Sequence, residues 1–119
     1  MSSISPKVQN QIAMLQQMQQ QMQTIRGQKA QYEMAVREAK RAIEELNDVA
    51  EDAPVFMSVG TVMMEKKRED VLDNLNNKIE TLELRIKSLE KQEGMLSSKF
   101  EQLQSQIKQA LEGRPHSAS

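Results

Sequence analysis

The side chains of this chain that could carry out chemistry are few, and they do not group into a catalytic site. The chain has 119 residues, one His at position 116 and no Cys. A lone His beside Ser and Pro is more typical of a solvated position than of a base or a ligand. The basic run at 66–68 precedes two acidic residues, which is typical of a solvated start of a helix and poor for binding phosphate. We therefore predict that the chain is not an enzyme and holds no cofactor or metal.

Composition and charge exclude several other classes. Only 38% of the residues are hydrophobic and 3% aromatic, so the chain lacks the large side chains that fill a compact globular core. Its 16 basic residues are balanced by 17 acidic ones, which argues against a nucleic-acid partner. The apolar runs are far shorter than the roughly 20 residues that span a bilayer. The N-terminal residues do not resemble a secretion signal, and the absence of Cys fits a reducing compartment.

Glycine and proline divide the sequence into two long stretches that are rich in helix-forming residues. Ser5 and Pro6 are typical of a helix start, and Gly113 with Pro115 is typical of a helix end. We predict a single domain over residues 1–119 with five segments: a tail at 1–5, a helical arm at 6–50, a β-hairpin at 55–64, a helical arm at 68–112 and a tail at 113–119.

Apolar residues in both arms recur at alternating steps of three and four, which predicts a coiled coil. We call these the seam positions. In the first arm they are Val8, Gln11, Leu15, Met18, Met22, Ile25, Lys29, Tyr32, Val36, Ala39, Ile43 and Leu46. In the second arm they are Leu72, Leu75, Ile79, Leu82, Ile86, Leu89, Glu93, Leu96, Phe100, Leu103, Ile107 and Ala110. Only Gln11, Lys29 and Glu93 interrupt this apolar pattern.

The two sets of seam positions also predict how the arms pair. When the second set is reversed, the residue numbers of every pair sum to 118, from Val8 with Ala110 to Leu46 with Leu72. The steps of three and four then coincide along the whole length. We therefore expect a mainly α fold in which the arms form a long antiparallel coiled-coil hairpin. The alternative, two helices that pair in parallel with other chains, does not require arms of equal length.

The segment between the arms has a different composition. Residues 55–64 are mostly β-branched, aromatic or Met, and Gly60 lies near the centre, which predicts a β-hairpin with its turn near 58–61. Because a lone two-stranded hairpin is marginally stable, we expect it to join those of other subunits in an intersubunit β-barrel. An irregular loop packed on the helix ends is the alternative. The predicted oligomerisation residues are Val55, Phe56, Met57, Val59, Gly60, Val62, Met63 and Met64.

The end of the predicted coiled coil away from this segment is poor in charge. Between residues 1 and 25 the only charged side chain is Lys7, and both arms are rich in Gln here. Ile4, Ile12, Met14 and Leu111 add apolar groups outside the main seam. We interpret this end as an exposed binding surface that accepts many partners. The alternative is that Gln is simply a good helix former and that Met fills the seam.

Two glycines interrupt the arms at nearly the same level. Gly27 and Gly94 each cost roughly 1 kcal/mol relative to Ala inside a helix. Lys29 and Glu93 lie close to that level and could contact each other across the seam. We hypothesise a flexible joint at this position.

The central motif, Val55-Phe56-Met57-Ser58-Val59-Gly60-Thr61-Val62-Met63-Met64, and the stretches Lys78-Ile79-Glu80-Thr81-Leu82-Glu83 and Gln92-Glu93 resemble the beta-type subunits of archaeal prefoldin. The resemblance extends from about Val8 to Ala110. Subunits of the alpha type carry two hairpins, whereas this sequence has one.

The resemblance implies an ATP-independent, cytoplasmic chaperone subunit in a hexamer of two alpha and four beta subunits. Such a complex captures unfolded proteins at the coiled-coil tips and passes them to a group II chaperonin, to which the end of the second arm would contribute contacts. The implied client-binding residues are Ile4, Val8, Ile12, Met14, Leu15, Leu103, Ile107 and Leu111. The alternative function is a structural coiled-coil adaptor with one specific protein partner, and a coiled coil that binds nucleic acid is disfavoured by the balanced charge.

Overall fold

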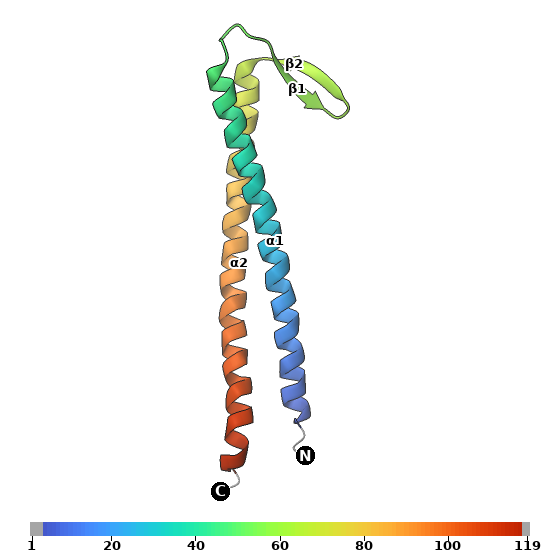
Figure 1. Ribbon diagram of the computed structural model, residues 1–119, viewed down its shortest axis with the longest axis vertical. Helices are drawn as coiled ribbons and strands as arrows, with labels where there is room; N and C mark the ends of the chain where they lie inside the picture. The colour runs from blue at the N-terminus through green and yellow to red at the C-terminus, as the bar shows by residue number, and fades with distance from the viewer. Residues whose placement is uncertain (1–3, 118–119) are drawn as a thin grey trace. The chain divides into compact units, whose positions relative to one another are not determined.

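The computed structural model describes the backbone of residues 4–117 and the side chains of residues 4–113. In chain order it contains helix α1 (Pro6–Asp48), strands β1 (Val55–Val59) and β2 (Val62–Lys66), and helix α2 (Arg68–Ser117) (Figure 1). The predicted order of helix, β-hairpin and helix is confirmed.

Helix α1 begins where the sequence places its start. The hydroxyl of Ser5 accepts a hydrogen bond from the backbone N–H of Val8 at 3.2 Å, and the Ser5 carbonyl accepts one from the N–H of Gln9 at 2.9 Å. Pro6 occupies the first helical position, where its missing N–H leaves no hydrogen bond unmade. The start of α1 is therefore determined by local sequence.

The far ends of the helices differ from the expected boundaries. Helix α1 ends at Asp48, two residues before the predicted end, and α2 continues to Ser117, five residues beyond the predicted end at Glu112. Gly113 and Pro115 thus lie within the helix and do not terminate it. Glycine costs about 1 kcal/mol relative to Ala, and proline removes one backbone hydrogen bond, so both disfavour helical backbone without forbidding it.

The chain divides into two compact units, which we describe separately. The central unit comprises residues 29–88, and the terminal unit comprises residues 1–28 together with 89–119. In the central unit, Val36, Ala39, Ile79 and Leu82 form a buried cluster between α1 and α2. Within this cluster, the residue numbers of Val36 and Leu82 sum to 118, and so do those of Ala39 and Ile79. This is the pairing predicted for antiparallel helices.

The terminal unit has a second buried cluster, made of Val8, Leu103 and Ile107. Ile12, Leu15, Met18 and Ala110 pack against it and remain partly accessible. All 24 seam positions of the chain are buried or partly buried, including Gln11, Lys29 and Glu93. The seam is therefore confirmed within both units. Val71 is the one buried hydrophobic residue of the described chain that lies outside it.

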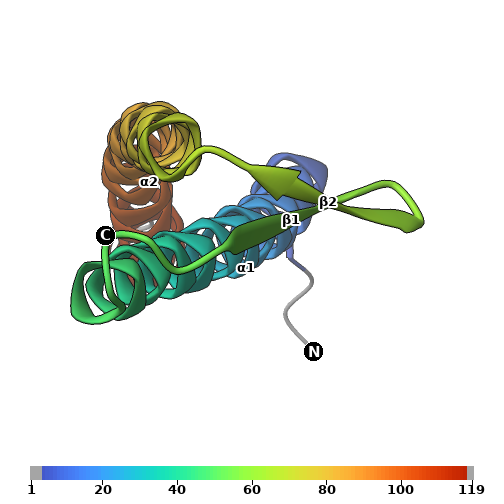
Figure 2. The ribbon, with the colours of Figure 1, turned by 90° about the horizontal axis from the view of Figure 1, so that it is seen from above.

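The β-hairpin lies in the central unit and extends to the side of the helix ends (Figures 1 and 2). Its strands are antiparallel, with Val59 opposite Val62 at the turn and Val55 opposite Lys66 at the base. Gly60 has a φ of 61°, whereas no described residue other than glycine has a positive φ. That combination fits a type II′ turn over Gly60 and Thr61, which matches the right-handed twist of a hairpin. The prediction of a β-hairpin here is confirmed, and its second strand continues two residues beyond Met64.

Candidate functional site

The β-hairpin presents apolar side chains on both of its faces. The register places Val55, Met57, Val59, Val62 and Met64 on one face, and Phe56 and Met63 on the other. Phe56 is 56% exposed, Val62 58% and Met63 69%. The sheet has only two strands, so each also has an unpaired edge within the described chain. Exposed apolar faces and free edges together are typical of a segment that is covered in an assembly.

Arg68, the first residue of α2, holds the end of α1. One guanidinium nitrogen donates to the carbonyls of Val49 at 3.2 Å and Ala50 at 3.4 Å, and the other donates to the carbonyl of Leu46. The last carbonyls of a helix lack partners within the helix, and a cation there also compensates the negative end of the helix dipole. The sequence analysis correctly placed a helix start at this basic run, but Arg68 is partly buried and hydrogen-bonded instead of fully solvated.

The eight predicted client-binding residues fall into three groups by exposure. Ile4, Met14 and Leu111 are exposed, at 39%, 50% and 41% of their surface. Ile12 and Leu15 are partly buried against the cluster of the terminal unit. Val8, Leu103 and Ile107 form that cluster and are at most 8% exposed. We call Ile4, Met14 and Leu111 the tip surface, since these three are accessible to a partner.

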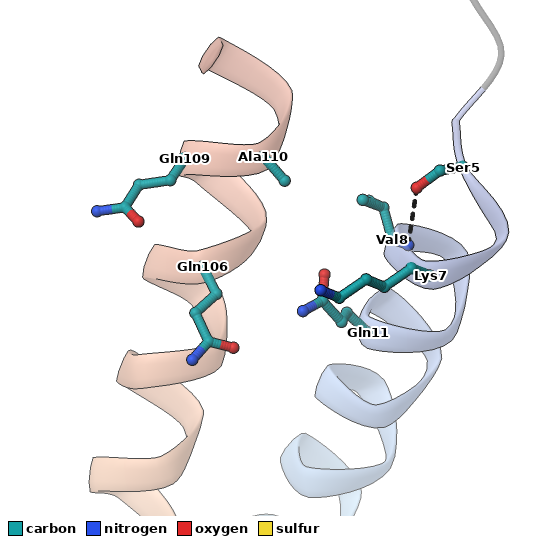
Figure 3. Close-up of a pocket in the computed structure, with 7 residues that line it drawn as sticks. All are labelled: Ser5, Lys7, Val8, Gln11, Gln106, Gln109 and Ala110. Atoms are coloured by element: carbon teal, nitrogen blue, oxygen red, sulfur yellow. Dashed lines mark hydrogen bonds between the residues drawn. The ribbon is translucent and has the colours of Figure 1, made fainter. Parts of the chain in front are cut away.

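A groove of about 650 Å³ opens between the start of α1 and the end of α2 (Figure 3). Val8 and Ala110 face each other across it, while Lys7 and Gln11 extend from α1 towards α2. Gln106 lies opposite them, and Gln109 points away from α1. The groove therefore combines a small apolar floor with side-chain amides, and none of the residues 4–113 that line it carries a carboxylate.

Ion pairs cross the coiled coil in both units. In the terminal unit Arg26 Nε lies 2.6 Å from Glu93 Oε2, and in the central unit Lys40 Nζ lies 3.9 Å from Glu83 Oε2. The guanidinium of Arg85 stacks over the ring of Tyr32, 5.9 Å from its centroid. The structure places Arg26 against the carboxylate of Glu93, a partner that the sequence analysis did not name. Each pair has at least one exposed partner, so it favours the antiparallel register at a modest gain in stability.

Within residues 4–113, no three His, Cys, Asp or Glu side chains are grouped as metal ligands would be. The described helices also include none with the length and apolar character needed to traverse a bilayer.

Comparison with known proteins places this architecture among related chains. A family model described as "Prefoldin subunit" matches residues 9–114. The chain is 66% identical to prefoldin subunit beta of Methanosphaerula palustris over the full length of both proteins. It is 61% identical to prefoldin subunit beta of Methanospirillum hungatei, with 96% of this chain and 95% of that one covered.

A solved structure shows the same similarity in three dimensions. The crystal structure of the prefoldin beta subunit from Thermococcus strain KS-1 matches with a TM-score of 0.86 at 38% identity. The match covers 93% of this chain and 97% of that one.

Proposed function

Because this chain belongs to the prefoldin subunit family, we propose that it captures unfolded polypeptides without ATP through its tip surface and passes them on for folding. Family membership confirms the predicted resemblance to beta-type subunits, and with it the prediction of a chaperone subunit that is not an enzyme. The capture of unfolded polypeptides and their transfer for folding are our proposal.

The exposure of the tip surface is the observation that carries this proposal. Ile4, Met14 and Leu111 remain 39–50% exposed near the ends of the helices. Apolar groups of this kind gain free energy when they leave water, about 25 cal/mol per Å² of buried apolar area. An unfolded chain exposes apolar side chains in any order, so flexible Met and unbranched Gln side chains suit partners of varied sequence.

We propose that the β-hairpin serves assembly. The apolar faces and free edges support a shared β-barrel with the hairpins of alpha-type subunits and further beta subunits. The family resemblance supports a hexamer of two alpha and four beta subunits. It also supports delivery of clients to a group II chaperonin in the cytoplasm, with contacts from the end of α2.

An aggregation assay tests the proposed capture. The protein is assembled with an alpha-type subunit, and several unrelated denatured proteins are diluted into it without nucleotide. We expect aggregation of all of them to be suppressed, because the tip surface recognises apolar side chains rather than one sequence. Suppression of none would contradict the proposal and favour an adaptor that binds one specific partner.

A further inference from the structure

We propose that glutamine side chains on one flank of the terminal unit bind the main chain of unfolded polypeptides, on the flank that also carries Met14 of the tip surface. The inference rests on the proposed client capture and adds the chemical group that is recognised. The partner is an extended, unfolded polypeptide, and the recognised atoms are its backbone N–H and C=O groups.

Two neighbouring grooves in the terminal unit are lined with side-chain amides. The groove at the helix ends contains Gln11, Gln106 and Gln109. A second groove of about 540 Å³ contains four further glutamines and two partly buried apolar residues of the seam. The lining glutamines of the second groove are Gln17, Gln20, Gln21 and Gln92.

The heptad repeat places both grooves on the same flank of the coiled coil. Gln92 and Gln106 lie two heptads apart on α2, so their side chains project from the same side of that helix. On α1, Gln21 lies two heptads after Lys7, which lines the first groove. The two groups of amides therefore share one flank, with Met14 and Lys99 in the same heptad register between them.

These amides are available to a partner. Among the seven glutamines that line the grooves, only Gln11 is partly buried, and the other six are exposed. In the described part of the chain, their side-chain amides make no hydrogen bond to another group. Thr24 also lines the second groove, and its hydroxyl donates a hydrogen bond to the backbone carbonyl of Gln20 at 3.1 Å.

A glutamine amide matches the chemistry of a peptide group. It offers N–H donors and a C=O acceptor, and each peptide group offers one donor and one acceptor in return, except at proline. Such bonds do not depend on the client's side chains. Among the described residues that line the two grooves, Lys7 is the only charged one, so basic and acidic clients meet little repulsion from these side chains. Ile25 and Leu96 add an apolar floor to the second groove.

The test replaces amides by a side chain of similar shape that lacks their hydrogen-bonding groups. The variant Gln21→Met/Gln92→Met keeps helix propensity and adds apolar surface. The matched control is Gln19→Met/Gln104→Met, because these exposed glutamines lie on the opposite flank, in heptad register with Ile12 and Leu111. Each variant is assembled with an alpha-type subunit, and circular dichroism checks that its helix content equals that of the wild type.

The probes are an unstructured peptide of fixed sequence and its analogue with alternate backbone nitrogens methylated, which keeps the side chains but removes N–H donors. We expect Gln21→Met/Gln92→Met to bind the unmethylated peptide about tenfold more weakly than wild type, equivalent to two modest hydrogen bonds. The control pair should bind like wild type. Methylation should weaken wild-type binding by a similar factor and have little effect on the variant.

Unchanged or tighter binding by Gln21→Met/Gln92→Met would overturn the inference, because apolar contact alone would then explain capture. If both pairs of substitutions weakened peptide binding equally, the inference would also be overturned, because the effect would not be specific to this flank. A wild-type complex that binds neither peptide and suppresses no aggregation would instead contradict the proposed function itself.

Discussion

At the scale of single residues, the guanidinium of Arg68 connects the start of α2 to the end of α1 through three backbone carbonyls. Its planar fork of N–H donors can reach several acceptors at once, which a lysine ammonium on a flexible stem does not reproduce. Because the β-hairpin lies between these two helix ends in the chain, Arg68 also restrains the base of the segment proposed for assembly.

Replacing Arg68 with Lys should destabilise the chain by about 1–2 kcal/mol, because hydrogen bonds from a charged donor to the helix end are lost. Urea denaturation followed by circular dichroism measures this change. Lys67→Ala is the control, since Lys67 is the exposed neighbour of Arg68. Equal stability of Arg68→Lys and wild type would contradict the role given to the guanidinium.

The tip surface supplies a second prediction at this scale. Met14→Gln/Leu111→Gln should lower aggregation suppression several-fold without a change in helix content, because both side chains are exposed and unneeded for the seam. Met34→Gln/Leu84→Gln is the matched control, with residues 54% and 63% exposed in the central unit. If only the control pair lost aggregation suppression, clients would bind outside the tip surface, and the prediction would be wrong.

Ile107 is a poor choice for such a test, because it is only 8% exposed. A Glu at this position would place a charge in the seam and open the coiled coil. Loss of capture would then have a structural cause.

At the scale of elements, the hairpin depends on a turn that only glycine adopts easily. Gly60→Ala should weaken the hairpin by about 1–2 kcal/mol, because an L-residue at a φ of 61° brings its Cβ close to the backbone. Native mass measurement of complexes with an alpha-type subunit should show less hexamer. Thr61→Ala is the control, and an unchanged hexamer in Gly60→Ala would argue against assembly through the hairpin.

Gly27 and Gly94 lie inside the helices at positions where a side chain would fit. A Cβ added at Gly27 or Gly94 would meet no atom within 4 Å, so Gly27→Ala/Gly94→Ala should stabilise the helices by up to about 1 kcal/mol per site. Hydrogen exchange around both sites should slow. If the wild type is already protected there as well as in the flanking heptads, the hypothesis of a flexible joint fails.

At the scale of the whole molecule, buried surface is arranged along a seam, and the hairpin leaves apolar faces uncovered in the described chain. Val62→Lys/Met64→Lys would place two charges on one face of the hairpin. We expect loss of the proposed hexamer with helix content retained, measured by native mass and circular dichroism. Glu65→Lys, which changes the charge on the other face, is the comparison. Full assembly of the double variant would contradict a role for this face.

The amino-acid sequence alone specifies the helices, the seam and the β-hairpin. The steps of three and four along each helix place the same residues on one side whatever surrounds them, and the type II′ turn depends on Gly60 itself. The resemblance to prefoldin subunits depends on the same local patterns. The motif at 55–64 and the stretches at 78–83 and 92–93 were therefore enough to predict it.

Tertiary structure decided which of those residues are available to partners. The sequence treats Ile12 and Met14 alike as apolar groups outside the main seam, but packing partly buries the first and leaves the second 50% exposed. Likewise, the acceptors of Arg68 lie 18 to 22 residues away in sequence, so no local pattern indicates them. Burial and long-range hydrogen bonds depend on where the opposite helix lies, and periodicity within one helix does not contain that information.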